Sequence, residues 1–197
     1  MNRLEEIKAH ALADSVPIMQ DGGLAILCEL VKNPKVKRVL EYGTAVGYSA
    51  IAMANANTTV EIDTFEIDQN RYSQAIDNIK ALGLDNRIHA YLQDGKEAQL
   101  NHCYDVVFVD AAKAQYKLYM EHAKPYLSEH GVYVFDNLNF HGIVDNPQLT
   151  NNRNTRSLVK KIKVFRDWLL TDPSIDVIFY KTQGDGVAVV KYRKESK

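Results

Sequence analysis

The chain has 197 residues, of which 46% are hydrophobic and 25% charged, and its formal net charge is −1. This composition is typical of a folded domain and excludes a disordered chain, while the balanced charge excludes a protein that binds nucleic acid through its overall charge. Cys28 and Cys103 are the only cysteines, and without metal-binding or disulfide spacing they favour the reducing cytoplasm. No apolar run approaches the ~20 residues that span a bilayer, and the first residues lack the apolar segment of a signal peptide. We therefore expect a single cytoplasmic domain over residues 1–197.

Residues 1–35 are predicted to form a helical cap with one break. The apolar residues at helical spacing are Leu4, Ile7, Leu12, Ile26, Leu27 and Leu30. Pro17 and two consecutive glycines indicate a loop over residues 16–23, and a loop before the first strand can fold over a ligand. Met19 in this loop is expected either to pack on a cofactor or to fill the core.

Residues 38–54 show the pattern of a strand, a glycine turn and a helix. The run Arg38–Tyr42 predicts a buried strand, and Gly43 and Gly47 break it before a helix-forming run. Such a unit presents a cofactor at the carboxyl end of its strand. The two glycines do not form the G-x-G-x-x-G fingerprint of dinucleotide sites, so a cofactor without a pyrophosphate is favoured, and S-adenosylmethionine fits. Glu41, just before the turn, is expected near its ammonium or sulfonium; the alternative is a structural turn whose glycines serve packing.

Strands and helices alternate from residue 36 onward. Further strands are predicted at residues 60–66, 88–92, 104–110, 131–136, 175–180 and 186–192, and further helices at 69–82, 116–127 and 158–170. This alternation predicts an α/β fold with a doubly wound sheet and helices on both faces. The turn at residues 184–186 predicts a final hairpin, which must add an antiparallel strand.

Residues at the ends of the second and third predicted strands extend the cofactor site. Glu66 follows the glycine turn by about 20 residues, where an acid accepts hydrogen bonds from both ribose hydroxyls. Its alternative role as a helix cap is weaker, because Asp68 offers that cap. Asp94 is expected to accept from the adenine amino group and Gly95 to donate to a ring nitrogen, although Asp-Gly is also a common turn.

A second polar group follows the fourth and fifth predicted strands. Asp110 and Asp136 end adjacent strands, which lie ~4.8 Å apart, so their carboxylates repel unless a cation lies between them. With the Asn137 amide they offer the oxygen ligands that Mg²⁺ prefers. Two neighbouring substrate oxygens could complete the site, and Lys113 could reach a substrate hydroxyl to deprotonate it. The alternative is a helix cap, a turn and a solvated lysine.

Four segments, residues 40–49, 65–68, 109–113 and 135–137, together resemble the cation-dependent class I O-methyltransferases, which include the catechol and caffeoyl-CoA enzymes. The resemblance implies a Rossmann-like sheet of order 3-2-1-4-5-7-6 with its last strand antiparallel, and a homodimer. The S-adenosylmethionine contacts that it implies are Met19, Glu41, Gly43, Ser49, Glu66, Asp94, Gly95 and Asp110. The Mg²⁺ ligands that it implies are Asp110, Asp136 and Asn137, with Lys113 and Asp110 as catalytic residues.

A basic stripe without acids follows at residues 151–166. Its basic residues are Arg153, Arg156, Lys160, Lys161, Lys163 and Arg166. A local basic stripe on a near-neutral protein predicts phosphate contacts, which we expect from Arg153, Arg156, Lys160 and Lys163. The alternative is a solvated helix face.

The run of residues 151–156 resembles the bacterial tRNA 5-hydroxyuridine methyltransferases, which form 5-methoxyuridine at the wobble position. This resemblance implies tRNA as the substrate, with a base splayed from the anticodon loop into the pocket. A catechol-like small molecule is the alternative acceptor. A non-catalytic nucleotide-binding module is the alternative class of protein.

Overall fold

The computed structural model describes residues 3–193, so residues 1, 2 and 194–197 of the predicted domain lie outside the described part. The α-helices are α1 (Arg3–Ala13), α2 (Asp21–Val31), α3 (Tyr48–Ala56), α4 (Gln69–Ala81), α5 (Tyr116–Ala123) and α6 (Arg153–Thr171). The strands are β1 (Arg38–Tyr42), β2 (Glu61–Glu66), β3 (Ile88–Leu92), β4 (Tyr104–Val109), β5 (Leu127–Phe135), β6 (Ile175–Tyr180) and β7 (Val187–Tyr192). Short 3₁₀ turns are η1 (Gly95–Glu97), η2 (Lys113–Gln115), η3 (Lys124–Tyr126) and η4 (Pro147–Leu149). Among the described residues, no helix combines the length and the apolar character needed to cross a membrane.

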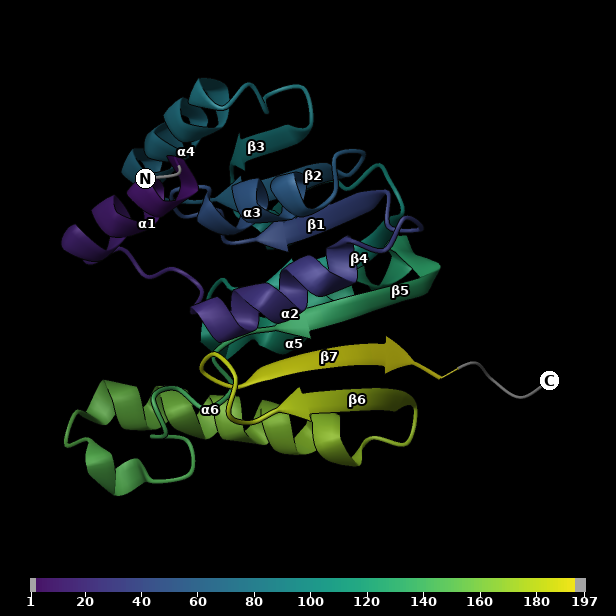
Figure 1. Cartoon of the computed structure of the whole chain (residues 1–197). Coiled ribbons are helices and arrows are strands. Elements are labelled where there is room, and N and C mark those ends of the chain that lie inside the picture. The colour runs from purple at the N-terminus through teal and green to yellow at the C-terminus, as the bar shows by residue number, and fades with distance from the viewer. Residues whose placement is uncertain (1–2, 194–197) are drawn as a thin grey trace.

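One seven-stranded sheet runs through the protein in the order β3-β2-β1-β4-β5-β7-β6 (Figure 1). Strands β1 to β5 pair in parallel, and β7 is antiparallel to both β5 and β6. This confirms the predicted Rossmann-like α/β fold and its strand order. The carboxyl ends of the parallel strands lie along one edge, at the left in Figure 1, so the polar residues that follow these strands can meet there.

Alternate residues of the buried strands belong to two separate hydrophobic cores. On β1, Val39 packs in the cluster that includes Leu27 of α2 and residues of α1, α3 and α4. The next residue, Leu40, belongs to the cluster of Met120 on α5 and Ile162 on α6. Successive side chains of a strand point to opposite faces, so a strand buried on both faces needs a continuous apolar run.

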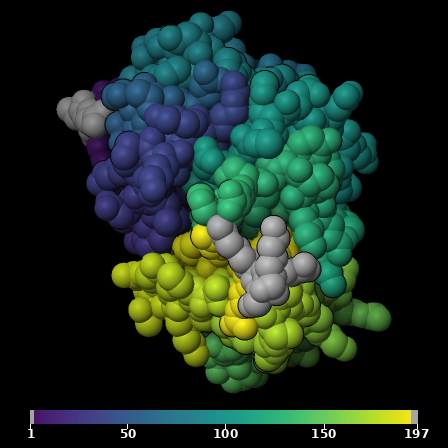
Figure 2. Space-filling model, turned by 90° about the vertical axis from the view of Figure 1, so that its right-hand side faces the viewer, coloured from purple at the N-terminus to yellow at the C-terminus, as the bar shows by residue number. Residues whose placement is uncertain are grey.

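The N-terminal, central and C-terminal parts of the chain pack closely against one another in the space-filling view (Figure 2).

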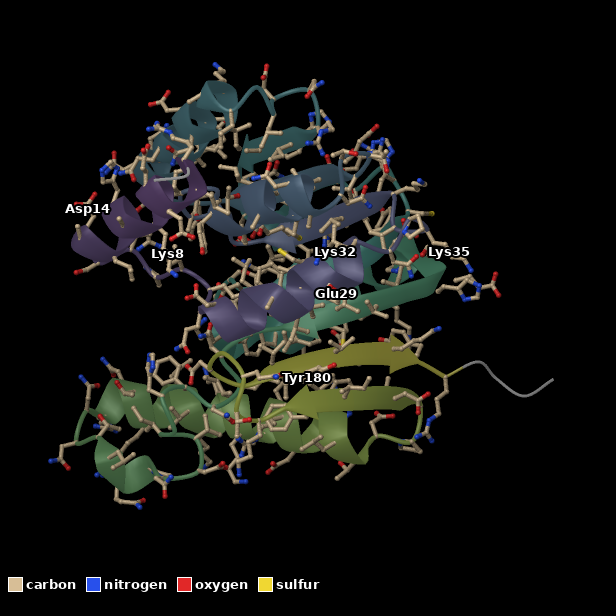
Figure 3. The ribbon with its side chains drawn as sticks, in the orientation of Figure 1. Lys8, Asp14, Glu29, Lys32, Lys35 and Tyr180 are labelled. Atoms are coloured by element: carbon tan, nitrogen blue, oxygen red, sulfur yellow. The ribbon has the colours of Figure 1, made fainter. Side chains whose placement is uncertain are left out.

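The two cap helices bury one face and expose the other. Glu29 and Lys32 point outward from α2 (Figure 3), and Lys32 Nζ lies 3.1 Å from Glu29 Oε2. Lys8 of α1 pairs with Asp21 at the start of α2, with 2.5 Å between Nζ and Oδ1. This pair joins the helices across the loop of residues 14–20, although solvent screening limits such a surface pair to about 1 kcal/mol or less.

The predicted break at residues 16–23 is partly wrong, because the glycine pair lies inside α2. A Cβ on Gly22 would lie 3.0 Å from the backbone nitrogen of Gly184, and one on Gly23 would lie 2.8 Å from Cε of Met19. The pair therefore allows α2 to pack closely against the β6–β7 hairpin, and it does not form a turn.

Two further boundaries differ from the prediction, each for a local reason. The helix expected to reach residue 127 ends earlier, as α5, because the following Pro125 is accommodated only in a short 3₁₀ turn, and β5 starts correspondingly earlier than residue 131. The helix expected from residue 158 already begins with α6. Its start is fixed by Asn152, whose Oδ1 accepts from the amides of Asn154 and Thr155 at 2.9 and 3.1 Å.

Candidate active site

A cavity of about 770 Å³ opens at the carboxyl ends of the parallel strands. Its walls come from the loop before α2, the β1–α3 turn, the ends of β2 and β3, the segment between β4 and η2, and the segment after β5. This size suits a small organic cofactor or ligand, and the position is the one at which open α/β sheets bind ligands. The predicted role of the loop before α2 as a cover is consistent with Val16, Pro17 and Ile18 in the wall.

The β1–α3 turn depends on a glycine that touches the end of β4. Gly43 has a φ of +102°, and a Cβ there would lie 2.6 Å from the carbonyl oxygen of Asp110. Only a residue without a Cβ tolerates both this backbone conformation and this approach. Gly47, with a φ of +83°, then precedes α3. The glycines are thus required by the turn itself, which brings the cavity wall close to Asp110.

Glu41 and Ser49 lie behind the cavity wall rather than in it. Both oxygens of the fully buried Glu41 carboxyl accept hydrogen bonds, from Ser49 Oγ at 2.5 Å and from Thr64 Oγ1 at 2.6 Å. Burial raises the pKa of Glu41 to about 7, and the two hydroxyl donors oppose the rise. Neither Glu41 nor Ser49 lines the cavity, so their contacts with a cofactor stay predictions.

Replacing Glu41 with glutamine is expected to remove a pH dependence from the free energy of unfolding. The folded-state pKa is raised, so the stabilising contribution is complete below the ordinary value of 4.5 and is lost as the pH rises through about 7. Between about pH 5 and about pH 8 the wild-type protein should lose on the order of 2 to 3 kcal/mol relative to Glu41→Gln. Urea unfolding of the cofactor-free proteins at both pH values measures this loss, with the exposed Glu29→Gln as a control. If the difference in the free energy of unfolding between the wild type and Glu41→Gln were the same at both pH values, the prediction would be wrong.

Glu66 lines the cavity, and its buried carboxylate holds the neighbouring backbone. Its Oε2 accepts from the amide of Ala45 at 2.8 Å, and its Oε1 accepts from the amides of Ile67 and Asp68, both at 2.9 Å. The cap of α4 is Asp68, whose Oδ1 accepts from two amides at 2.9 Å, so the alternative of Glu66 as a helix cap is wrong. The ribose contact predicted for Glu66 stays a prediction, and its place in the wall is compatible with it.

The other predicted cofactor residues divide between the wall and the core. Asp94 and Gly95 line the cavity; Asp94 caps η1 and pairs with Lys96, and a Cβ on Gly95 would lie 2.5 Å from the Tyr42 ring. Met19 is buried in the core beside α2 and does not line the cavity. The structure thus places Met19 where the core-filling alternative expected it.

Asp110, Lys113 and Asn137 converge at one side of the cavity. Lys113 Nζ lies 2.9 Å from Asp110 Oδ1 and also donates to Asn137 Oδ1. The two oxygens therefore already face a shared cation, the ammonium of Lys113. Asn137 has a left-handed φ of +59°, a conformation that costs a non-glycine residue about 1 kcal/mol or more and is found at functional sites.

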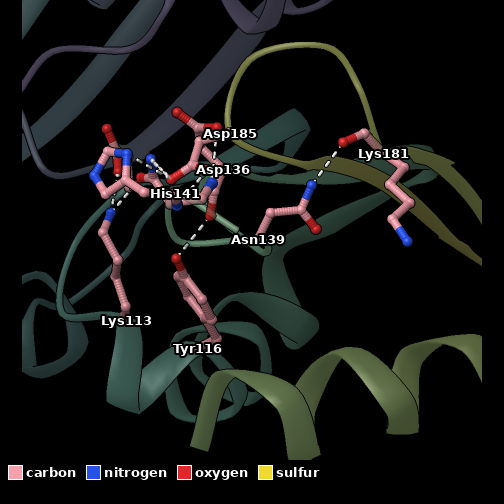
Figure 4. Close-up of polar contacts among 9 residues, drawn as sticks. Lys113, Tyr116, Asp136, Asn139, His141, Lys181 and Asp185 are labelled. Atoms are coloured by element: carbon pink, nitrogen blue, oxygen red, sulfur yellow. Dashed lines mark hydrogen bonds and ion pairs between the residues drawn. The ribbon is translucent and has the colours of Figure 1, made fainter. Parts of the chain in front are cut away.

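Asp136 lies beside this cluster and has an oxygen without a partner. Its Oδ1 accepts from the amide of Asn137 at 2.7 Å, whereas Oδ2 is buried and has no hydrogen-bond partner within the described residues. Burial, together with the nearby Asp110 charge, raises the pKa of Asp136 to about 7. The hydroxyl of Tyr116 donates to the Asp136 carbonyl at 2.7 Å and fixes the end of β5 (Figure 4). A buried carboxylate oxygen without a partner fits a place where a cation binds.

The candidate metal ligands include an amide, so they differ from a metal site made only of acidic, histidine and cysteine side chains. Within residues 3–193, no three or more His, Cys, Asp and Glu side chains form a group suited to a metal ion. The candidate set has two carboxylates, from Asp110 and Asp136, and takes its third oxygen from the Asn137 amide. Such an all-oxygen set is compatible with Mg²⁺, which binds few protein ligands and keeps other positions open.

Asp185, on the β6–β7 hairpin, is a site residue that the sequence did not reveal. Its buried carboxylate accepts from the His141 amide at 2.7 Å through Oδ1 and from Asn137 Nδ2 at 3.4 Å through Oδ2 (Figure 4). A carboxylate can only accept, so it directs the nitrogen of the Asn137 amide toward itself and leaves the oxygen facing Lys113. The only signal in the sequence was an acid between two glycines, which also describes an ordinary hairpin turn.

The basic stripe is shorter in the structure than in the sequence. Arg153, Arg156 and Lys160 are exposed on α6, and Lys163 is exposed but lies 2.9 Å from Asp167 Oδ2. Arg166 is buried, which corrects its place in the stripe. Its guanidinium donates to Leu138 O at 3.4 Å and to Asn139 Oδ1 at 3.1 Å, and it pairs with Asp145. Arg166 therefore holds the segment after β5 and does not form a free basic surface.

Comparisons with known proteins agree with this fold. The O-methyltransferase family profile matches residues 1–193. The chain is 27% identical to the caffeoyl-CoA O-methyltransferase of Medicago sativa, over 97% of this chain and 81% of that protein. A candidate caffeoyl-CoA O-methyltransferase from Staphylococcus aureus superposes with a TM-score of 0.90 at 29% identity, over 96% of this chain and 92% of that one. The SAH-bound methyltransferase PaMTH1 of Podospora anserina shares the fold, with a TM-score of 0.87 at 23% identity over 98% of this chain and 89% of that one.

The family match spans nearly the whole chain, and the sheet order is the one that the resemblance implied. The expected class of enzyme is confirmed at the level of the family. The protein belongs to the O-methyltransferase family, the S-adenosylmethionine-dependent enzymes that its sequence resembles.

Proposed function

We propose that the protein transfers the methyl group of S-adenosylmethionine to 5-hydroxyuridine at the wobble position of tRNA, in a Mg²⁺-dependent reaction that gives 5-methoxyuridine. The observation that carries the proposal is the convergence of Asp110, Lys113 and Asn137 beside the buried Asp136, on one side of a cavity large enough for the cofactor.

The cavity supports S-adenosylmethionine as the methyl donor. Its volume of about 770 Å³ suits a nucleoside cofactor, and Glu66 is one of the residues that line it. PaMTH1 and an O-methyltransferase from Bacillus cereus, both with this fold, bind SAH, the product of such a transfer.

The neighbouring residues fit a Mg²⁺ ion. Asp110 and Asn137 already direct oxygens at a cation, and Asp136 has a buried oxygen free for one. We expect these three residues to hold the ion. When bound, Mg²⁺ would lower the pKa of the acceptor hydroxyl.

Lys113 and Asp185 would carry out the other steps, which are removal of a proton and orientation of a ligand. Lys113 Nζ, in its unprotonated form, would take the proton of the acceptor hydroxyl. The oxygen would then attack the methyl carbon, the carbon–sulfur bond would break, and its electron pair would stay on the sulfur of the departing S-adenosylhomocysteine. Asp185 would keep the Asn137 oxygen directed at the site throughout.

The exposed cations of α6 support tRNA as the acceptor. Arg153, Arg156 and Lys160 are exposed in the first half of α6, the helix that follows the candidate metal residues, and phosphate contacts are their expected role. In 5-hydroxyuridine the hydroxyl adjoins the C4 carbonyl, so the base offers the two neighbouring oxygens that a catechol also has.

We also propose that the protein is a homodimer, as the resemblance implies. Light scattering, which measures the molar mass in solution, tests this.

The decisive experiment uses tRNA from a bacterium that lacks 5-methoxyuridine formation. The protein is incubated with this tRNA, labelled S-adenosylmethionine and Mg²⁺, and the nucleosides are then separated. We expect labelled 5-methoxyuridine, lost when EDTA removes the metal. Label that remains equally in the presence of EDTA would contradict the metal dependence, and unlabelled tRNA would contradict the acceptor.

A catechol-like small molecule is the second candidate acceptor. It is favoured by the caffeoyl-CoA O-methyltransferases among the relatives, which share the fold and most of the chain. The same assay with a free catechol in place of tRNA separates the two. Rapid methylation of the catechol with none of the tRNA would reverse the ranking.

Replacing Asp185 with asparagine is expected to weaken divalent-cation binding roughly tenfold. The neutral side chain can turn its own nitrogen toward Asn137, so the Asn137 amide is no longer oriented, and loss of such outer contacts typically costs 10- to 100-fold in metal affinity. Calorimetric titration with Mg²⁺ in the presence of SAH measures the change without any turnover. Asp176→Asn, an exposed acid on β6, is the matched control. Unchanged Mg²⁺ affinity in Asp185→Asn would exclude the orienting role.

A further inference from the structure

A second hollow, of about 420 Å³, lies between the η2–α5 segment and α6. We call it the Trp168 groove. The lining residues that matter here are Lys113, Lys117, Lys160, Lys161, Val164 and Trp168. No acid lines it, and its floor is aromatic and apolar.

We propose that the Trp168 groove binds a nucleotide of the RNA acceptor next to the methylated one, with its base on Trp168 and its phosphate among the lysines. This inference rests on the proposed function, because it names where the same substrate continues beyond the reacting base.

The floor of the groove suits a planar base. Trp168 lies partly exposed on α6, with its ring centroid 5.8 Å from that of Phe165, which anchors it to the core. Val164 beside it is 64% exposed, an unusual position for a large apolar side chain. Single-stranded RNA is held in this way, with unstacked bases on aromatic side chains, at about 1–3 kcal/mol for each base.

The rim of the groove suits a phosphate. Lys160 and Lys161 form no ion pair within residues 3–193, in contrast to Lys163, which faces Asp167. Lys117 Nζ lies 4.8 Å from the centre of the Trp168 ring, so a cation already rests on the face that a base would take. A base that stacked there would release Lys117 toward the adjoining phosphate.

The groove and the cavity meet at one residue. Lys113 lines both hollows, and it contacts Asp110 and Asn137 on the cavity side. A chain that places one base beside Lys113 therefore reaches the groove with the nucleotide next to it. This continuity favours an acceptor longer than a single base over a small catechol, which would leave the groove without a role.

The first test uses the fluorescence of Trp168, the only tryptophan of the chain. Titration of the whole protein with single-stranded oligouridylate is expected to quench this fluorescence, with an affinity that falls as salt rises. Double-stranded RNA and coenzyme A serve as comparison ligands. Quenching by coenzyme A or by double-stranded RNA but not by oligouridylate would overturn the proposal, and so would the absence of any quenching. A shift of the emission that depends only on protein concentration would assign the groove to contact between two copies and would also overturn it.

The second test reverses the charge of the rim. Lys160→Glu/Lys161→Glu is expected to weaken oligouridylate binding at least tenfold and to reduce the salt slope by about 0.7 for each lysine that contacts a phosphate. Lys80→Glu, an exposed lysine on α4, is the matched control. Unchanged binding and an unchanged salt slope in the double variant would refute the proposal.

The outcome is separable from that of the proposed function. If the unaltered protein methylates tRNA and the double variant keeps its KM for tRNA, the groove proposal fails and the function stands. If oligouridylate quenches Trp168 but no tRNA is methylated, the function fails and the groove remains an RNA-binding surface.

Discussion

Substitution of Asp136 by alanine is expected to abolish methyl transfer while most of the cofactor affinity remains. Asp136 supplies the buried Oδ2 atom that has no partner within the described residues, and it does not line the cofactor cavity. Loss of one of the two carboxylates expected to hold Mg²⁺ removes half of the ligand charge, and the several kcal/mol that a metal supplies correspond to about 10³-fold or more in rate. Initial rates at saturating Mg²⁺ and calorimetric titration with SAH measure the two quantities separately.

Two further expected results distinguish a loss of metal binding from a loss of folding. Asp136→Asn retains the shape and one oxygen donor, so its rate should lie between those of the wild type and Asp136→Ala. Removal of a buried carboxylate also removes its desolvation cost, so neither variant should unfold more easily above about pH 8. Full activity of Asp136→Ala would leave the assignment of the metal residues without support.

Substitution of Lys113 by methionine is expected to slow methyl transfer by roughly 10²- to 10⁴-fold and, at the same time, to tighten Mg²⁺ binding. The loss of rate follows from the loss of the group that would take the hydroxyl proton. The gain in affinity follows because the Lys113 ammonium now contacts Asp110 and Asn137, two of the expected metal ligands, and competes for their oxygens. Single-turnover rates and Mg²⁺ titrations of the same preparation test both directions.

Lys113→Arg separates the proton transfer from the charge. Arginine keeps the positive charge beside Asp110 but does not lose a proton in this pH range, so its rate should be as low as that of the methionine variant. Lys124→Met, at the other end of α5, is the control for a lysine outside the site. If Lys113→Arg retained the wild-type rate, the role of Lys113 would be electrostatic and not that of a base.

The parts of the fold that the sequence predicted are those set by local pattern. The apolar run of residues 104–109 must be buried on both faces, and glycines at 43 and 47 must turn the chain, so the order of strands and turns follows from neighbouring residues. The meeting of polar side chains at the ends of the strands was predictable for a related reason. Parallel strands place their carboxyl ends on one edge, so Asp110 and Asn137 meet there through Lys113.

The parts that the sequence did not predict depend on contacts between distant segments. Asp185 reaches Asn137 only because β7 returns beside β5, and a hairpin turn would carry the same residues without that contact. Arg166 has the pattern of a surface cation, yet the carbonyl of Leu138 and the carboxylate of Asp145 satisfy it in the interior. Met19 was equally compatible with a cofactor and with the core, because an apolar side chain carries no signal for either.

The approach of Gly22 to Gly184 has a consequence for how the protein tolerates change. The nearest atom to a Cβ on Gly22 belongs to the main chain of the hairpin, so no side chain there can rotate away to make room. Added bulk at position 22 must shift the hairpin as a body, and the hairpin carries the acid that aims the Asn137 oxygen. We therefore expect substitutions of Gly22 to weaken binding of the proposed Mg²⁺ ion before they lower the free energy of unfolding.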